Sequence, residues 1–299
     1  MNTYPSCNLC GSSDAVFYCS KDSLDVIRCL KCGLIYTPEM RSHAEMKEHY
    51  SEEYFKPYLQ TEVLHARKRF RKRIKEIKRL RFAGSLLDIG CGPGFFLKLA
   101  SDEGYAVSGI ELSQWASEYA KKHFSLNVIT GELKDAGFAP DTFDIITLWH
   151  ILEHVTDPAK FLLEVNRLLK MDGLLVVEVP NIQSAAAKLA GTSWELMAPK
   201  EHFFYYNLHT ISQLLQTTGF TITGNSSYFW TTPGMILRAR AGLKTGLGRF
   251  WLRSVALLLE AFSFFRFKTM PGLIRGDVIT VYACKTKNTG PGSGNTDAF

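Results

Sequence analysis

The sequence has no long uninterrupted apolar run, although 46% of its 299 residues are hydrophobic. Its most apolar stretch, residues 251–265, is interrupted by Arg253 and Glu260 and is shorter than the roughly 20 residues that a membrane-spanning helix needs. The first residues also lack a basic segment followed by an apolar one, the pattern of a secretory signal. These absences predict a globular, cytoplasmic protein without a transmembrane helix.

Cysteines are few, seven in all, and four of them stand in two C-x2-C pairs near the N-terminus. In a reducing compartment, pairs at this spacing indicate a metal site rather than a set of disulfides. Two such pairs supply four thiolates, the arrangement that structural zinc prefers, whereas a redox dithiol requires only one pair. The sequence therefore predicts a zinc ribbon over residues 1–40 with the ligands Cys7, Cys10, Cys29 and Cys32, and it leaves Cys19 as a spare thiol.

Acidic residues are nearly absent from two segments, although the net charge of the chain is only +6. Residues 67–81 hold ten Lys and Arg with one acid, and residues 238–275 hold eight with one acid. Such segments favour an anionic partner: phosphate, a membrane surface or nucleic acid. Apolar residues recur at helical spacing in the first segment, at Phe70, Ile74, Ile77 and Leu80. The preferred interpretation is a helix that docks by this face and keeps its charges in water.

Apolar and helical segments alternate from residue 85 onward. Strands are predicted at 85–90, 106–112, 126–131, 143–150 and 173–181, with helical segments between most of them. Alternation of this kind is typical of a parallel sheet that is covered by helices on both faces. Ligands of such sheets bind beyond the carboxyl ends of the strands.

Three glycines follow the first of these strands, in the pattern D-x-G-x-G-x-G from Asp88 to Gly94. The dinucleotide pattern G-x-G-x-x-G would need a glycine at Phe95, and no Walker lysine follows, so neither a dinucleotide nor a triphosphate fits. A nucleoside without a pyrophosphate does fit, because glycines allow a close approach of the backbone and Asp88 offers a carboxylate to an ammonium group. Glu111, at the end of the next strand, is placed to accept hydrogen bonds from both ribose hydroxyls.

With these motifs the chain resembles class I S-adenosylmethionine (SAM)-dependent methyltransferases over residues 85–181 and 202–285. The resemblance rests on LLDIGCGPG, GIEL, GELKDAGFAPDTFDIITLWHILEHVTDP and LLKMDGLLVVEVPN. It implies SAM as the cofactor and a Rossmann-like α/β fold, a seven-stranded doubly wound sheet whose last two strands, near 220–226 and 277–285, are antiparallel. The predicted cofactor-binding residues are Asp88, Gly90, Cys91, Gly92, Gly94, Glu111, Leu112, Glu132, Leu133 and Trp149.

Two clusters of polar residues follow predicted strands on the side where an acceptor would bind. PKEHFFYY, with Glu201 and His202, is similar to the Y-x-E-H segment of nucleotide-sugar C-methyltransferases, which also carry a cysteine-rich zinc module, but Pro199 replaces the tyrosine. HILEH is similar to E-x-x-E-H of quinone O-methyltransferases, with His150 in place of the first glutamate.

For these two clusters we predict His202 as the acid/base, together with Glu201, and His150 as the second candidate. Packing among aromatic side chains is the competing role of His202. A divalent ion at His150, Glu153 and His154 remains an open alternative, and packing at a helix start is the competing role of His154.

Four segments are predicted along the chain: the zinc ribbon (1–40), a helical linker with the basic helix (41–84), the methyltransferase domain (85–285) and a disordered tail (286–299). About fifty residues separate the last two strands, far more than a hairpin loop needs. We interpret this insertion, 227–276, as a lid or a buried segment. Peripheral membrane contact through 249–268 is the alternative.

The predicted function is methyl transfer from SAM to a small, anionic or partly apolar acceptor. A nucleotide-linked sugar or other glycan precursor, or a lipid- or quinone-like compound, is the expected substrate class. An RNA methyltransferase that uses the zinc ribbon and the basic helix is the first alternative. A non-catalytic SAM-binding protein is the second.

Overall fold

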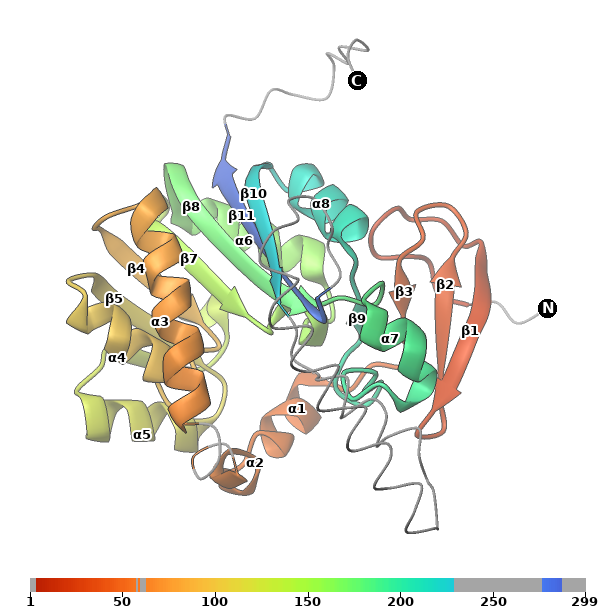
Figure 1. Cartoon of the computed structure of the whole chain (residues 1–299), viewed down its shortest axis with the longest axis horizontal. Helices are drawn as coiled ribbons and strands as arrows, with labels where there is room; N and C mark the ends of the chain where they lie inside the picture. Colours follow the sequence, from red (N-terminus) through yellow and green to blue (C-terminus); the bar gives the residue numbers. More distant parts are fainter. Residues whose placement is uncertain (1–3, 58, 60–62, 229–275, 287–299) are drawn as a thin grey trace, which may run out of the picture.

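The computed structural model describes residues 4–57, 59, 63–228 and 276–286, in which a seven-stranded and a four-stranded sheet lie side by side (Figure 1). The large sheet has the strand order β10-β11-β8-β7-β4-β5-β6. Its strands are β4 (Ser85–Ile89), β5 (Ala106–Glu111), β6 (Val128–Thr130), β7 (Phe143–Trp149), β8 (Leu169–Pro180), β10 (Phe220–Tyr228) and β11 (Val278–Lys285). Strands β4 to β8 pair in parallel, whereas β11 pairs antiparallel with both β8 and β10. The predicted α/β sheet with an antiparallel pair at one edge is confirmed.

Helices cover both faces of this sheet (Figure 1). Helices α3 (Val63–Leu80), α4 (Phe95–Asp102) and α5 (Gln114–Phe124) lie on one face, and α6 (Pro158–Leu168) and α8 (Leu208–Thr217) lie on the other. Alternate residues of a strand enter different cores: Leu86 packs in the cluster of Phe96, whereas its neighbour Leu87 packs in the cluster of Leu162. Side chains along a strand alternate between its faces, so both faces of the sheet are buried.

Helix α3 is the predicted basic helix, and it docks by three of its four predicted apolar residues. Phe70, Ile74 and Ile77 are buried, but Leu80 is 46% exposed because it lies at the last turn of the helix. The expectation that all charges of this helix stay in water is wrong at Arg73, whose residue is only 5% exposed. Arg73 follows Phe70 by three positions and therefore lies on the same face.

The four-stranded sheet contains the cysteine segment. Strands β1 (Ala15–Lys21), β2 (Leu24–Cys29) and β3 (Ile35–Tyr36) are antiparallel neighbours, and the fourth strand is β9 (Phe204–Tyr205), which follows β8 in the sequence. Helix α7 (Ala185–Ala190) contributes to the core on one side of this sheet. The cysteine segment thus completes its sheet with a strand from the predicted methyltransferase domain, a pairing that the sequence did not indicate.

Short helices connect the two sheets to one another. Helices α1 (His43–His49) and α2 (Glu52–Pro57) lead from the small sheet to α3. A capping box between Ser42 and Glu45 begins α1.

The structure also contains single turns of 3-10 helix: η2 (Leu133–Asp135), η3 (Leu152–His154) and η4 (Gly191–Ser193). Of these, η3 follows the carboxyl end of β7 and brings the HILEH segment to the edge of the large sheet.

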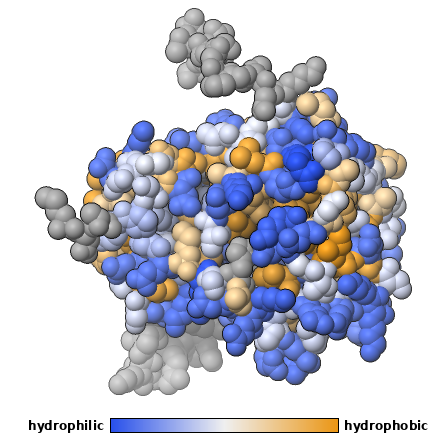
Figure 2. Space-filling view, turned by 180° about the vertical axis from the view of Figure 1, so that it is seen from behind, coloured by the Kyte–Doolittle hydropathy of each residue, from blue (hydrophilic) through white to orange (hydrophobic). Residues whose placement is uncertain are grey.

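Most of the predicted insertion, 229–275 with the proposed membrane-contact segment 249–268, lies outside the described residues, as does 287–299 of the tail. Among the helices that are described, none is long and apolar enough to cross a membrane. On the face seen from behind, hydrophilic residues predominate and apolar residues show between them in smaller areas (Figure 2).

Candidate active site

A cavity of about 1080 Å³ opens at the carboxyl ends of β4, β5 and β7. Its lining includes all predicted cofactor-binding residues except Gly94: Asp88, Gly90, Cys91, Gly92, Glu111, Leu112, Glu132, Leu133 and Trp149. The same cavity is lined by His150, Glu201 and His202, the three predicted catalytic residues. The fold therefore brings both predicted sets of residues to one space, as expected at this edge of a doubly wound sheet.

The glycine turn between β4 and α4 admits no larger side chain at its first glycine. Gly90 has φ +72°, and a Cβ at this position would come within 2.0 Å of Ile151 Cδ1. Gly94, which does not line the cavity, is the N-cap of α4 in a left-handed conformation. The glycines keep this turn narrow, so its backbone can approach a ligand closely.

Glu111 is buried at the end of β5, and its carboxylate is oriented by the backbone. Oε2 accepts a hydrogen bond from the Gly92 N–H and Oε1 accepts one from the Ser113 N–H, both at 2.8 Å. Burial raises the pKa of Glu111, and these N–H groups oppose the rise. Each carboxylate oxygen retains a further lone pair, so the group can accept hydrogen bonds from a diol in the cavity.

Asp88 is the second buried carboxylate of the cofactor side. It is 1% exposed, and its Oδ1 accepts a hydrogen bond from Thr147 Oγ1 at 2.6 Å. Burial raises the pKa of Asp88 from 3.8 to about 7. The hydrogen bond from Thr147 and the positive charge of Arg73 lower the pKa, but their effect is smaller. A cationic ligand group beside Asp88 would favour the ionised carboxylate.

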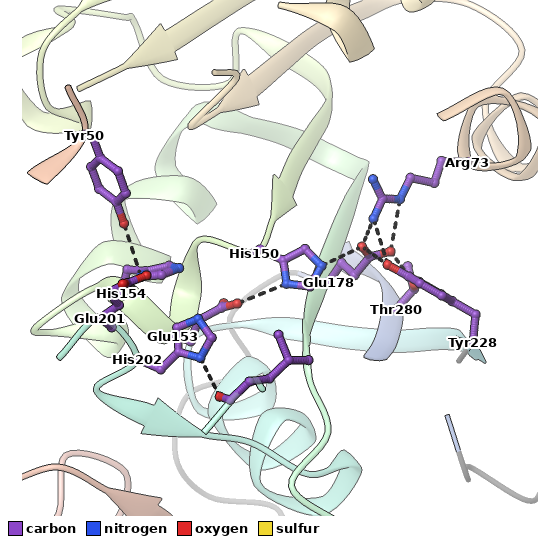
Figure 3. Close-up of polar contacts among 11 residues, drawn as sticks. Tyr50, Arg73, His150, Glu153, His154, Glu178, Glu201, His202, Tyr228 and Thr280 are labelled. Atoms are coloured by element: carbon purple, nitrogen blue, oxygen red, sulfur yellow. Dashed lines mark hydrogen bonds and ion pairs between the residues drawn. The ribbon is translucent and has the colours of Figure 1, made fainter. Parts of the chain in front are cut away.

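A third carboxylate, Glu178 of β8, is fully buried and was not predicted from the sequence. It forms an ion pair with Arg73, whose Nε lies 3.1 Å from Oε2. Tyr228 Oη donates to Oε1 at 2.9 Å, and Thr280 Oγ1 donates to Oε2 at 3.0 Å (Figure 3). The Arg73 guanidinium also lies 4.2 Å from the ring centroid of Trp149. The sequence did contain a signal for this contact, since Glu178 is the one charged residue in the apolar run GLLVVEVPN. A charge buried in such a run requires a partner.

His150 lies between Glu178 and a further buried carboxylate, Glu153 (Figure 3). Its Nδ1 is 3.2 Å from Glu153 Oε1, its Nε2 is 3.2 Å from Glu178 Oε1, and its φ of +57° is left-handed. Burial, then Arg73 and Arg69, lower the pKa of His150 to about 3, whereas burial raises that of Glu153 to about 7. The low pKa keeps His150 neutral near pH 7.

The two predicted catalytic clusters meet in the structure. The ring centroids of His154 and His202 are 4.8 Å apart. His154 Nδ1 lies 2.9 Å from the Glu201 carbonyl oxygen, and His202 Nδ1 lies 2.8 Å from that of Leu196. Because a carbonyl oxygen only accepts, each Nδ1 carries the hydrogen and each Nε2 keeps a lone pair. The Glu201 carboxylate points elsewhere, 3.3 Å from His49 Nε2.

Two groups of side chains in the described residues have ligand atoms close enough to hold a metal ion. Cys7, Cys10, Cys29 and Cys32 form the first, with their sulfur atoms within 4.8 Å of one another. The second consists of Glu153, His154 and His202, whose ligand atoms also lie within 4.8 Å of one another. It includes His202 rather than His150, whose ring nitrogens lie against Glu153 and Glu178.

Comparisons with known proteins identify the family of this chain. The profile of the family described as "Methyltransferase domain" matches residues 57–224, more than half of the chain. The chain belongs to this family. Together with the strand order and the glycine turn, the match identifies a class I SAM-dependent methyltransferase domain.

Curated relatives of this methyltransferase match a smaller part of it. "Ubiquinone biosynthesis O-methyltransferase, mitochondrial" of Schizosaccharomyces pombe is 38% identical over 104 residues, 32% of this chain and 38% of the relative. The "Ubiquinone biosynthesis O-methyltransferase" of Glaesserella parasuis is 31% identical over 148 residues, 45% of this chain and 63% of the relative. The chain therefore spans less than two thirds of the length of either relative.

A solved structure shows the same fold. It is a SAM-dependent methyltransferase of Thermotoga maritima, titled a "possible histamine N-methyltransferase", with a TM-score of 0.52 and 17% identity. The similarity covers 78% of this chain and 98% of that one. At this identity the likeness concerns the fold and not the acceptor.

Arg73→Met should destabilise the methyltransferase by about 3–5 kcal/mol, because it leaves the Glu178 carboxylate buried without its cation. The matched control is Lys72→Met, since Lys72 is an exposed neighbour whose ion pair with Glu76 is worth at most about 1 kcal/mol. Urea unfolding measures both. Equal effects of the two substitutions would contradict the structural role of Arg73.

Asp88→Asn should alter how stability depends on pH. The folded-state pKa of Asp88, about 7, lies above its ordinary value of 3.8, so its stabilisation is complete below about pH 4 and is lost as the pH rises to about 7. Asparagine does not ionise, and its amide oxygen still accepts from Thr147. We expect the variant to gain stability relative to the wild type between about pH 4 and about pH 7. Denaturant unfolding without SAM tests this, and parallel pH profiles would show that Asp88 ionises normally.

Proposed function

We propose that this chain transfers the methyl group of SAM to a small acceptor. The acceptor class we propose is a nucleotide-linked sugar or another glycan precursor, or a lipid- or quinone-like compound. One observation supports the proposal above the others: a single cavity is lined by Asp88 and Glu111 on one side and by His202 on another. SAM, when bound, supplies a methyl group on a positively charged sulfur.

The lining of the cavity supports an acceptor that is partly apolar and partly anionic. Three aromatic side chains line it: Tyr50, the C-cap of α1, and Tyr54 and Phe55 of α2. Arg41 and Arg69 add positive charge. Aromatic walls suit planar or apolar groups, and guanidinium groups suit phosphate or carboxylate. The ubiquinone-related names of the curated relatives support the quinone-like member of this class.

The proposed mechanism uses His202 as the general base. Asp88, Glu111 and the glycine turn would hold SAM, which would supply its methyl group to the nucleophilic atom of the acceptor. The proton of the nucleophilic atom passes to Nε2 of His202, whose lone pair is available because Nδ1–H donates to the Leu196 carbonyl oxygen. Glu201 positions the neighbouring His154 through its backbone carbonyl.

The four-cysteine group is proposed to hold a structural zinc ion. The sulfur atoms of Cys7 and Cys32, and those of Cys10 and Cys29, are 3.5 Å apart. Zinc–sulfur bonds of about 2.3 Å in a tetrahedron separate the sulfurs by about 3.8 Å, so the cysteines fit zinc closely. Four thiolates leave no position for water, which makes the ion structural. All seven cysteines are free of disulfides, which supports a cytoplasmic location.

Glu111→Ala should weaken SAM binding about 10- to 100-fold, since it removes the carboxylate proposed to accept both ribose hydroxyls. Isothermal titration calorimetry gives the dissociation constant, and a thermal melt verifies that the variant is folded. Glu118→Ala, on the exposed surface of α5, is the control. An unchanged affinity in Glu111→Ala would place the ribose elsewhere.

His202→Ala should lower turnover by about 100-fold or more, which is the usual contribution of a general base, with less than a twofold change in SAM affinity. The assay uses the acceptor identified by screening sugar nucleotides, quinols and lipid precursors. His209→Ala, on the exposed side of α8, is the matched control. If His202→Ala turns over normally, His202 has a packing role only.

A further inference from the structure

The cysteine module, residues 4–37, contacts the backbone of the proposed base directly. Strand β3 pairs with β9, the two residues that begin two positions after His202, with Ile35 opposite Tyr205 and Tyr36 opposite Phe204. The Thr37 N–H donates to the Phe203 carbonyl oxygen at 2.9 Å, and Thr37 Oγ1 lies 3.5 Å from the carbonyl oxygen of His202 itself. The module therefore determines where the His202 backbone lies.

A second contact from the same module holds the loop whose backbone binds the imidazole. Lys21, the last residue of β1, donates from Nζ to the Met197 carbonyl oxygen at 2.5 Å and to that of Trp194 at 3.3 Å. Between these two residues lies Leu196, whose carbonyl oxygen accepts the His202 Nδ1–H at 2.8 Å. By holding this loop, Lys21 maintains the tautomer in which Nε2 has its lone pair.

Both contacts depend on a small sheet with little stability of its own. Strands β3 and β9 contain two residues each, and strands this short are not stable alone. Strand β3 begins shortly after Cys32, and Cys7, Cys29 and Cys32 belong to the core that contains Phe203 and Phe204. A metal ion at the four cysteines would lock this core, because binding couples to folding.

We propose that the metal-bound cysteine module positions His202, with Lys21 and β3 as the positioning elements. The inference rests on the proposed function in two respects: His202 is the base and the cysteines hold zinc. It places the module behind the residues that line the cavity, as a support for His202. It also predicts that the cofactor side, formed by β4, β5 and the glycine turn, is independent of the metal.

Lys21→Met tests the contact of Lys21 with the loop at 194–197, and Lys31→Met, an exposed lysine between two cysteines, is the matched control. Nitrogen-15 NMR of labelled histidines reports the tautomer, with the His202 signals assigned by their loss in His202→Gln. We expect Lys21→Met to shift His202 away from the Nδ1–H tautomer and to lower turnover about tenfold. Bound zinc per chain and SAM affinity should stay within twofold of the wild type. An unchanged tautomer, or a parallel loss of SAM affinity, would overturn the role of Lys21.

Cys10→Ser tests the role of the metal, with Cys19→Ser as the control because Cys19 lies outside the four-sulfur group. Bound zinc is counted by native mass spectrometry, and amide hydrogen exchange is followed by mass spectrometry. Loss of zinc should speed amide hydrogen exchange in 203–206 at least tenfold. Exchange in 106–111 and SAM affinity should both stay within twofold of their wild-type values. Zinc loss without faster exchange in 203–206 would overturn the coupling alone. A wild-type protein that binds no zinc would overturn the metal assignment, and SAM binding by that protein would leave the proposed cofactor site intact.

Discussion

The burial of the Glu178 carboxylate in the middle of the large sheet constrains much of the molecule. A charge removed from water is tolerated only with partners, and here they come from four different elements. Arg73 brings α3, Tyr228 brings β10, Thr280 brings β11, and His150 brings the end of β7. One carboxylate thus connects the basic helix, the antiparallel edge and the cavity wall. A hydrophobic residue at this position would leave Arg73 buried without its partner and would specify none of these placements.

The histidines of the cavity, among them the proposed base, are ordered by the backbone as much as by one another. His154 and His202 both donate Nδ1–H to carbonyl oxygens, so in each neutral ring the lone pair is at Nε2. His150 differs, because it is held between two carboxylates in a left-handed conformation. Three histidines in one cavity therefore have two distinct environments, and the first is the one that suits the proposed proton transfer.

The sequence predicted the features that depend on local pattern. The glycine turn, Glu111 at the end of the next strand and the two cysteine pairs are short motifs whose spacing determines their geometry, and the structure brings each set together. Arg73 was missed because the helix was interpreted by its apolar residues only, although its spacing from Phe70 already put it on the buried face. The β3–β9 pairing had no local signal, since two-residue strands far apart in sequence carry no detectable period.

The small sheet has a further consequence for the order of folding. Strands β1 to β3 are synthesised first, but their fourth strand, β9, emerges from the ribosome only after β4 to β8 have been made. Contacts between residues so distant in the chain form late, because the chain entropy of closing a long loop must be overcome first. The cysteine segment must therefore remain incomplete while the parallel sheet assembles. A metal ion captured early would protect these strands from pairing with other chains during that interval.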